Sequence, residues 1–551
     1  MRRIPLYKHQ GFEKLSNHYY SEILRRNPIA ATWIGEHSYD SLLPETGAEA
    51  VEKEIAFFRE FRDAFSALPE RELTIDERID RKVVQQIASK ELFMLEDARR
   101  WRLGRDLVRT LGDAIFILFT RDFAPLSQRI ESIITRLKAS PMFLQEGKSL
   151  FQDVPEFWCE IFLQSCDGFI GLIKTIEKNI KGHVSANLFK SFEISAKTAI
   201  GAVQAHSHWF KHAVAPYAHG KWSMGKGPFD ALLAIRELGM SSSEILELGN
   251  QSLQKTRERL SGLAKQISPS GTIEETSQKI QAHSPSTFER VLEAYQEAVA
   301  RSRVFVEQSG FATLPPNEAL EVMETPSYMA HLIPFAAYCQ PEKTSKTQKG
   351  IYLVTRPPEN ELKKRHSYAE ITNTSIHEGY PGHHLHFSAQ NLHPGKMRIF
   401  ADSIELIEGW AHYCEEETKR MGFEASDENL FMQTKDEAWR AARVLIDINT
   451  HSGSWNLDKA VDFLVETVGI PKSAALAELS WYSQLPGYPL SYLTGKHLLY
   501  NLREEMRASF GRDFTHRDFH DIVLNEGSLP IFIAREYYPE ILKENLQSIG
   551  A

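Results

Sequence analysis

The segment HEGYPGHHLH, from His377 to His386, contains four histidines and one carboxylate within ten residues. Its first two residues match the HExxH pattern of zinc sites. In that pattern, histidines at i and i+4 share one helical face and bind one metal, and the glutamate acts as general base. Here position i+4 is Pro381, so the pattern is interrupted. Metal chemistry at this segment therefore requires another histidine to reach the face of His377.

Two histidines could complete the pair. A bulge at Tyr380–Gly382, where a proline-glycine pair disfavours regular helix, would loop out two residues and return His383 to the face of His377. His384, at i+7, would return after two regular turns. At about 1.5 Å per residue it would then lie about 10 Å along the axis, near the limit for sharing an ion. We prefer His383 and keep His384 as the alternative.

A third ligand is expected from the segment Ile404–Glu417, which is amphipathic at helical spacing and rich in carboxylates. Glu408 follows His383 by 25 residues, which leaves room for a turn and a second, antiparallel helix. Two histidines and one carboxylate leave the fourth position of a zinc ion open for water, as in catalytic sites. The two segments together predict one Zn²⁺, or another divalent ion, bound by His377, His383 and Glu408.

These residues resemble known peptidase motifs. With two residues inserted, HE..GHHLH is similar to the HEFGHALH signature of thimet-type oligopeptidases, and that alignment favours His383. The chain is more similar to the bacterial family called domain of unknown function 885, whose members carry HE.YPGHH followed by EGWA.Y.E. Residues 27–45, 439–455 and 485–495 also resemble motifs of that family. The resemblance implies a gluzincin-like, metal-dependent peptidase.

The motif at 485–495 also resembles one in thermostable zinc carboxypeptidases, which place a tyrosine donor there. Tyr492 is therefore the expected oxyanion donor, although simple packing would explain it equally well. His451 is a weaker candidate for holding substrate or oxyanion, and helix capping is its alternative role. The chain departs from the family pattern at Trp481, where arginine is expected, and at Tyr488, where glutamine is expected, so a substrate contact is expected to differ.

The predicted function is hydrolysis of short peptides by metal-activated water. The zinc ion would lower the pKa of the water towards about 7, and Glu378 would take the proton and return it to the leaving amine. A helical cap over the cleft is expected to exclude folded proteins. Two alternatives stay open: a metal-dependent hydrolase of a non-peptide amide or ester, and a non-catalytic helical binding protein. A second histidine group, at residues 206, 208 and 212, is interpreted as structural or surface-exposed.

The composition is that of a globular protein: 42% of the 551 residues are hydrophobic and 25% are charged. A formal charge of −9 gives no basic surface for nucleic acid and would be repelled by an anionic membrane. The N-terminal residues lack the apolar core of a secretory signal, and no run of about 18 apolar residues occurs. We expect a cytoplasmic protein with a small peptide substrate. The oligomeric state is left open.

The elements that must position these residues are mainly helical. Apolar residues at three- and four-residue spacing predict helices at 13–26, 48–68, 75–95, 126–137, 186–212, 436–449, 458–468, 472–484 and 493–509. Residues 216–227 suggest a boundary between a helical N-terminal domain, 1–220, and a catalytic domain, 221–551.

A small sheet is expected beside the metal cleft. Residues 327–340 and 350–356 are apolar or β-branched and predict a hairpin. By resemblance to gluzincins, GIYLVTR, at residues 350–356, is expected to be an edge strand that binds extended peptide. The predicted fold class is mainly α, a large helical bundle-like protein with this small sheet.

Overall fold

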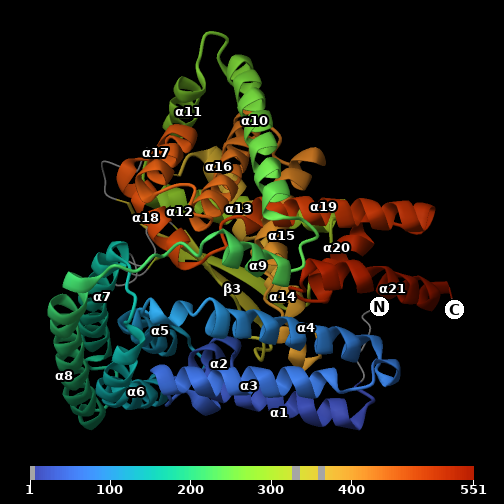
Figure 1. The fold of residues 1–551 in the computed structure, drawn as a ribbon. Coiled ribbons are helices and arrows are strands. Elements are labelled where there is room, and N and C mark those ends of the chain that lie inside the picture. The colour runs from blue at the N-terminus through green and yellow to red at the C-terminus, as the bar shows by residue number, and fades with distance from the viewer. Residues whose placement is uncertain (1–6, 326–335, 358–365, 551) are drawn as a thin grey trace.

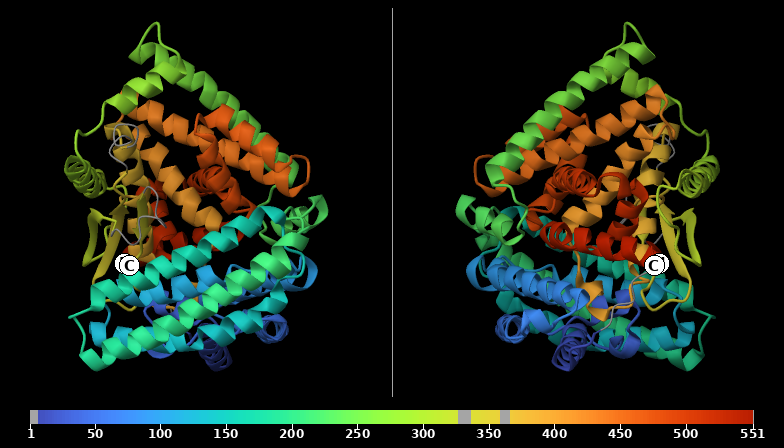
Figure 2. Two further views of the ribbon diagram at one scale, coloured as in Figure 1. Left: turned by 90° about the vertical axis from the view of Figure 1, so that its left-hand side faces the viewer. Right: turned by 90° about the vertical axis from the view of Figure 1, so that its right-hand side faces the viewer.

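The computed structural model describes residues 7–325, 336–357 and 366–550. Within them the chain is mainly helical and carries one three-stranded mixed sheet, which confirms the predicted fold class. Helices α1 to α8 lie together in the lower part of Figure 1, below most of the later helices, and Figure 2 shows this arrangement from both sides. Every helix of the described part is too short or too polar to cross a lipid bilayer.

The first eight helices are α1 (Gln10–Arg26), α2 (Pro28–Ile34), α3 (Ala48–Ser66), α4 (Ile75–Leu92), α5 (Leu107–Thr120), α6 (Leu126–Gly147), α7 (Glu156–Ile180) and α8 (Ala186–Trp209). The later helices are α9 (Lys226–Ile235), α10 (Ser242–Ile267), α11 (Ile273–Ala282), α12 (Phe288–Ser309), α13 (Tyr368–Glu378), α14 (His383–Gln390), α15 (Ile404–Arg420), α16 (Asp427–His451), α17 (Leu457–Val468), α18 (Lys472–Gln484), α19 (Ser491–Phe510), α20 (His516–Asn525) and α21 (Ile531–Gly550). The strands are β1 (Glu318–Glu324), β2 (Ala336–Cys339) and β3 (Gln348–Val354).

Five of the eight N-terminal helices form where the apolar spacing predicts them, although α6 runs ten residues further, to Gly147, and α2, α5 and α7 were not predicted. In α3, Phe57, Phe61 and Phe65 recur every four residues and therefore line one helical face. That face packs on Phe12 and Tyr19 of α1 in a shared buried core. The predicted division of the chain between residues 220 and 221 stays a prediction.

Helices α15 and α19 pack closely because each has a glycine at the crossing. A Cβ atom on Gly495 would lie 1.9 Å from the carbonyl oxygen of Glu405, and one on Gly409 would lie 2.5 Å from the backbone of Gly495. Neither helix could approach its neighbour this closely with a larger residue at these positions. The contact places the first two turns of both helices side by side, and these turns carry Glu408 and Tyr492.

The sheet has the strand order β1-β3-β2, with β1 parallel and β2 antiparallel to β3. The predicted hairpin is present as β2 and β3, with Tyr338 opposite Tyr352, although residues 327–335 of its first arm lie outside the described residues. The expectation that GIYLVTR is an edge strand is wrong, because most of it forms the central strand β3. Strand β1, which the sequence pattern did not indicate, covers the other side of β3. The edge strand of the hairpin is β2.

Candidate metal centre

The helix that carries HEGYPGHH breaks completely at the proline-glycine pair. Helix α13 ends at Glu378 and α14 begins at His383. Across the break, the amide of Gly382 donates to the carbonyl of Ile376 (3.0 Å), and that of Leu385 donates to the carbonyl of Gly379 (3.3 Å). Both bonds span six residues instead of the four of an α-helix. Two residues are thus inserted between the helical faces, and His383 lies beside His377.

The three residues predicted as metal ligands come together. Glu408 Oε2 lies 3.7 Å from His377 Nε2 and 3.4 Å from His383 Nε2. One ligand atom from each residue lies within 4.8 Å of the others, and all three residues are buried. Two ligands at about 2.0–2.1 Å from a tetrahedral zinc ion are about 3.3–3.4 Å apart. The separations are longer than hydrogen bonds and close to that value, so the donor set fits a metal ion.

Glu415 fixes the ring of His377 from the opposite side. Its Oε1 lies 2.7 Å from His377 Nδ1, and because a carboxylate only accepts, Nδ1 is the donor and Nε2 faces the cluster. Arg440 Nη2 donates to the same Oε1 (3.1 Å), and Asn373 Nδ2 donates to Oε2 (2.9 Å). Glu415 was not predicted. Its position seven residues after Glu408, two turns along the same helical face, could have indicated it.

The charges of this cluster stabilise one another. Burial would lower the pKa of His377, but the neighbouring carboxylates of Glu408 and Glu415 raise it to about 10. Burial would raise the pKa of Glu408, but His377 and His383 hold it well below its usual range. A buried carboxylate between two histidines therefore stays ionised. An ionised carboxylate next to imidazole nitrogens is the donor chemistry that a divalent cation requires.

Two further residues hold the cluster in shape. The hydroxyl of Tyr488 donates to Glu408 Oε1 (2.8 Å), so Oε2 is the oxygen that faces both histidines. The indole of Trp410, in α15, donates to the carbonyl of Pro381 (2.9 Å) and fastens the loop between α13 and α14. Tyr488 stands where the family resemblance suggested glutamine, and its partner is the carboxylate of the candidate ligand Glu408.

A cavity of about 430 Å³ opens onto the three candidate ligands. Glu378 and Tyr492, the predicted general base and oxyanion donor, both line it, and Arg443 lies 4.7 Å over the ring of Tyr492. Burial raises the pKa of Tyr492 well above its usual value, so its hydroxyl stays protonated. The cavity is lined by Trp33, Tyr338, Gln340, His377, Glu378, His383, Phe387, Ile404, Ile407, Glu408, Tyr488 and Tyr492.

Two histidines of the sequence analysis point elsewhere. The ring of His384 lies between Tyr338 (OH to Nδ1, 3.1 Å) and Glu318 (Nε2 to Oε2, 3.0 Å), so it joins α14 to the sheet. His451 does not line the cavity. Its Nε2 lies 3.3 Å from the carbonyl of Tyr482, and its ring stacks on Phe229. Burial lowers the pKa of His451 to about 3, and we remove it from the proposed site.

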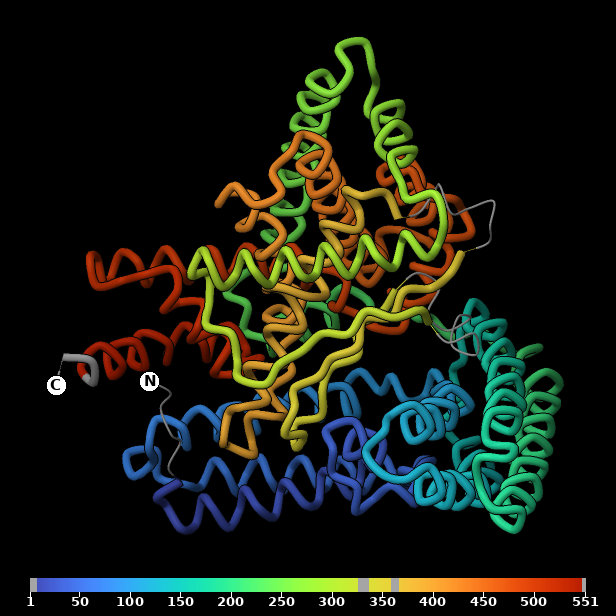
Figure 3. Tube along the Cα trace, turned by 180° about the vertical axis from the view of Figure 1, so that it is seen from behind, coloured from blue at the N-terminus to red at the C-terminus, as the bar shows by residue number. Residues whose placement is uncertain are grey.

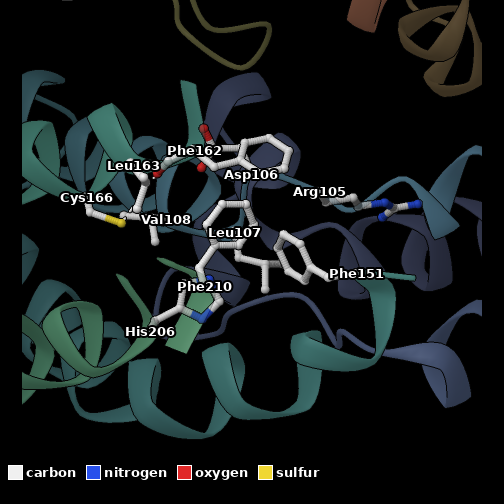
Figure 4. A pocket seen from close by; sticks show the side chains of 10 residues that line it. All are labelled: Arg105, Asp106, Leu107, Val108, Phe151, Phe162, Leu163, Cys166, His206 and Phe210. Carbon is white, nitrogen blue, oxygen red and sulfur yellow. Dashed lines mark hydrogen bonds between the residues drawn. The ribbon is translucent and has the colours of Figure 1, made fainter. Parts of the chain in front are cut away.

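Two other histidine-containing groups among the described residues have different surroundings. His206 lines a cavity of only about 10 Å³ whose other lining residues are mostly apolar (Figure 4), and burial lowers its pKa to about 4. Its neighbours His208 and His212 contact each other on the helix. A second close group consists of Asp76, His393 and Glu526. Its two carboxylates already pair with the guanidinium of Arg398, so its geometry is that of a buried ion network.

Fold and site together define a large helical protein with a candidate two-histidine, one-carboxylate metal centre beside a small sheet. A model of bacterial proteins of unknown function, DUF885, matches residues 28–536, so the chain belongs to that family. No curated protein matches it in sequence.

Two solved structures share the fold. One, described as a putative lipoprotein of unknown function from Shewanella oneidensis, superposes with a TM-score of 0.79 at 19% identity, covering 95% of this chain and 99% of its own. The other, a putative lipoprotein from Colwellia psychrerythraea, has a TM-score of 0.81 at 18% identity, covering 97% and 99%. At these identities the likeness shows the fold alone.

Proposed function

We propose that this protein is a zinc-dependent hydrolase that cleaves peptide bonds in short peptides. His377, His383 and Glu408 would hold the ion, and Glu378 would be the general base. One observation carries the proposal: the buried ligand cluster and the carboxylate next to it in sequence face the same cavity. A binding protein has no need of a carboxylate beside such a cluster, whereas hydrolysis requires a base there.

The chain's own residues supply the proton transfers. When bound, zinc would lower the pKa of a water molecule and polarise the substrate carbonyl. Glu378 accepts the proton of that water and passes it to the leaving nitrogen. Tyr492, on the same cavity, donates a hydrogen bond to the carbonyl oxygen as negative charge develops there, a contribution of about 3–4 kcal/mol for one such donor.

Strand β2 is the best support for a peptide substrate. It is the edge strand on the cavity side of the sheet, and Tyr338 and the adjoining Gln340 line the cavity. An extended peptide can pair with such an edge through main-chain hydrogen bonds. We therefore propose that β2, instead of GIYLVTR, is the edge strand that binds extended peptide.

The connection between the sheet and the N-terminal helices supports a short substrate. Arg121 donates to the carbonyls of both Trp33 (2.7 Å) and Gln340 (3.1 Å), and the amide of Lys343 donates to the carbonyl of Ile34 (3.1 Å). Figure 3 shows the chain between β2 and β3 reaching the N-terminal helices at this point. The cavity volume is within the range of small-ligand sites, about 300–1,000 Å³. Folded proteins should therefore be excluded.

The variant Glu378→Gln tests the proposal. It keeps the size of the side chain and leaves all three candidate ligands in place, so the zinc content should be unchanged while peptide cleavage falls by about 10²–10⁴-fold. A matched control is Glu416→Gln, which changes a carboxylate that pairs with Lys496 outside the ligand cluster. A Glu378→Gln protein that retains both zinc and the full rate would contradict the proposal.

A panel of substrates distinguishes the proposed peptidase from the alternative, a metal-dependent hydrolase of a non-peptide amide or ester. A non-peptide amide or ester would use the same residues, so efficient cleavage of such compounds and none of peptides would favour it.

We also propose that the protein acts in the cytoplasm, as its sequence predicts. Recovery of the natural protein in a membrane fraction would contradict that location.

A further inference from the structure

The cavity has an apolar side that the proposed reaction does not use. Phe387 follows His383 by one turn of α14, so the two share a helical face, and their rings are stacked 5.9 Å apart. Ile404 and Ile407 precede Glu408 in the first turn of α15 and also line the cavity. Large apolar side chains therefore adjoin two of the three candidate metal ligands.

The fourth apolar residue comes from the other end of the chain. Trp33 is the next-to-last residue of α2 and lines the same cavity. Arg121 holds it in place, with its guanidinium 4.6 Å over the indole ring and one nitrogen bonded to the carbonyl of Trp33. Gly35, with φ +90°, ends α2 directly afterwards, and a Cβ there would lie 2.2 Å from Thr344 Oγ1. Trp33 is thus a fixed wall of the cavity.

The charges around the cavity disfavour polar substrate side chains. Its lining among the described residues includes the carboxylates Glu378 and Glu408 but no lysine or arginine. Against the apolar side, an acidic side chain would find no lysine or arginine, and a basic one would find no carboxylate apart from the proposed base and ligand, so either would lose its hydration without a free partner. An apolar side chain gains from leaving water and loses no hydrogen bond.

We propose that Trp33, Phe387, Ile404 and Ile407 form a subsite for one bulky apolar side chain of the peptide, next to the bond that is cleaved. The proposal rests on the proposed peptidase function and adds the substrate class to it: short peptides with a phenylalanine- or leucine-like residue beside the cleaved bond. Trp33 and Phe387 supply flat surfaces for such a side chain, and the two isoleucines supply branched ones.

Tripeptides Ala-X-Ala, with X as Phe, Leu, Ala, Lys or Glu, test the subsite in two ways. The zinc-loaded protein should cleave the Phe and Leu peptides with a kcat/KM about 10- to 100-fold above that of the Ala peptide, and should cleave the Lys and Glu peptides least. The zinc-loaded Glu378→Gln protein should show the same order of affinity by calorimetry, which measures binding without turnover. Equal affinities for the Phe and Ala peptides would overturn the subsite.

Variants of two of the four residues test whether the subsite produces the preference. Trp33→Leu and Ile407→Val should each reduce the preference for Phe over Ala several-fold. Trp101→Leu, a change of another half-buried tryptophan of the N-terminal helices outside the cavity, should leave it unchanged. A preference that survives both cavity changes would overturn the assignment. If calorimetry shows the Phe preference but the wild-type protein cleaves none of the peptides, the subsite stands and the peptidase proposal fails.

Discussion

At the scale of single residues, His377 is held at both ring nitrogens. Glu415 accepts from Nδ1, and Nε2 faces Glu408. The orientation of the candidate ligand is therefore determined by a residue that would not touch the metal. Glu415 is itself fixed by Arg440 and Asn373, so the helices α13, α15 and α16 all contribute to the position of one imidazole.

Replacing Glu415 should weaken metal binding without removing a ligand. Glu415→Gln loses the ionised acceptor of His377 Nδ1, and we expect the affinity for zinc to fall by about 10- to 100-fold. Competition with a chromophoric chelator measures this change. The neighbouring Glu416→Gln should bind zinc as tightly as the wild type, and an equal loss in both variants would contradict the assigned role of Glu415.

Metal binding should also depend on pH through His377. The pKa of His377 is raised to about 10, whereas that of a histidine in the unfolded chain is about 6.5. The charged ring therefore stabilises the metal-free protein fully below about pH 6.5, and this contribution is lost as the pH rises through about 10. A metal can bind only the neutral ring, so binding releases a proton in this window. We expect the zinc affinity to rise by up to about tenfold per pH unit between pH 6.5 and 8. A pH-independent affinity over this range would be inconsistent with the cluster.

At the scale of elements, the break between α13 and α14 creates the candidate site, and the sequence indicates it directly. The proline-glycine pair predicts an irregular segment, and the helix spacing then favours His383. Among the helices around it, apolar spacing predicts α15 and the second half of α16, and α18 has the predicted bounds. Strand β1 could not be found this way, because its glutamates and apolar residues do not alternate strictly and because it pairs in parallel with β3, which is distant in sequence.

Features that depend on long-range packing also could not be predicted from the sequence. Strand β3 is central because β1 pairs with it, and without β1 the sequence predicted β3 as the edge strand. His451 was a candidate for holding substrate or oxyanion, but its ring packs on Phe229. No local sequence pattern distinguishes a histidine that contacts substrate from one that packs in the interior. The helix α11 lies within residues 268–286, whose polar composition suggests a linker, although the capping box at Thr272 marks the start of the helix.

A methyl group at Gly382 should destroy the break. A Cβ there would lie 1.9 Å from the carbonyl oxygen of His377, so Gly382→Ala must displace the residue that carries a candidate ligand. We expect loss of bound zinc and a lower unfolding temperature. Gly201→Ala is the control, because it lies inside α8 with nothing within 4 Å, and it should stabilise the protein by about 0.5–1 kcal/mol. Unchanged zinc binding in Gly382→Ala would contradict the described loop.

At the scale of the whole molecule, a buried ion network crosses the predicted domain boundary. Arg398, in the 3₁₀ helix Lys396–Phe400, donates to Asp80 (2.6 Å) and Asp76 (3.3 Å) of α4 and to Glu526 (2.7 Å) beyond α20. All four side chains are buried. Helix α4 of the N-terminal part is thereby tied to the C-terminal part that carries the candidate metal centre.

Removal of this guanidinium should destabilise the entire molecule. Arg398→Ala leaves three buried carboxylates without their shared partner, a change that typically costs about 3–5 kcal/mol. Urea denaturation should show the loss. Arg71→Ala, at a side chain that is 88% exposed, should change stability by no more than about 0.5 kcal/mol. Equal stabilities of the two variants would show that the network does not hold the parts together.

The most direct test of the metal centre is the zinc content of the purified protein, measured by inductively coupled plasma mass spectrometry with the His383→Ala and His384→Ala variants. We predict about one zinc ion per chain in the wild type and in His384→Ala, because His384 faces Glu318. His383→Ala should lose it. Absence of metal from the wild type after zinc reconstitution, or its loss from His384→Ala alone, would contradict the account.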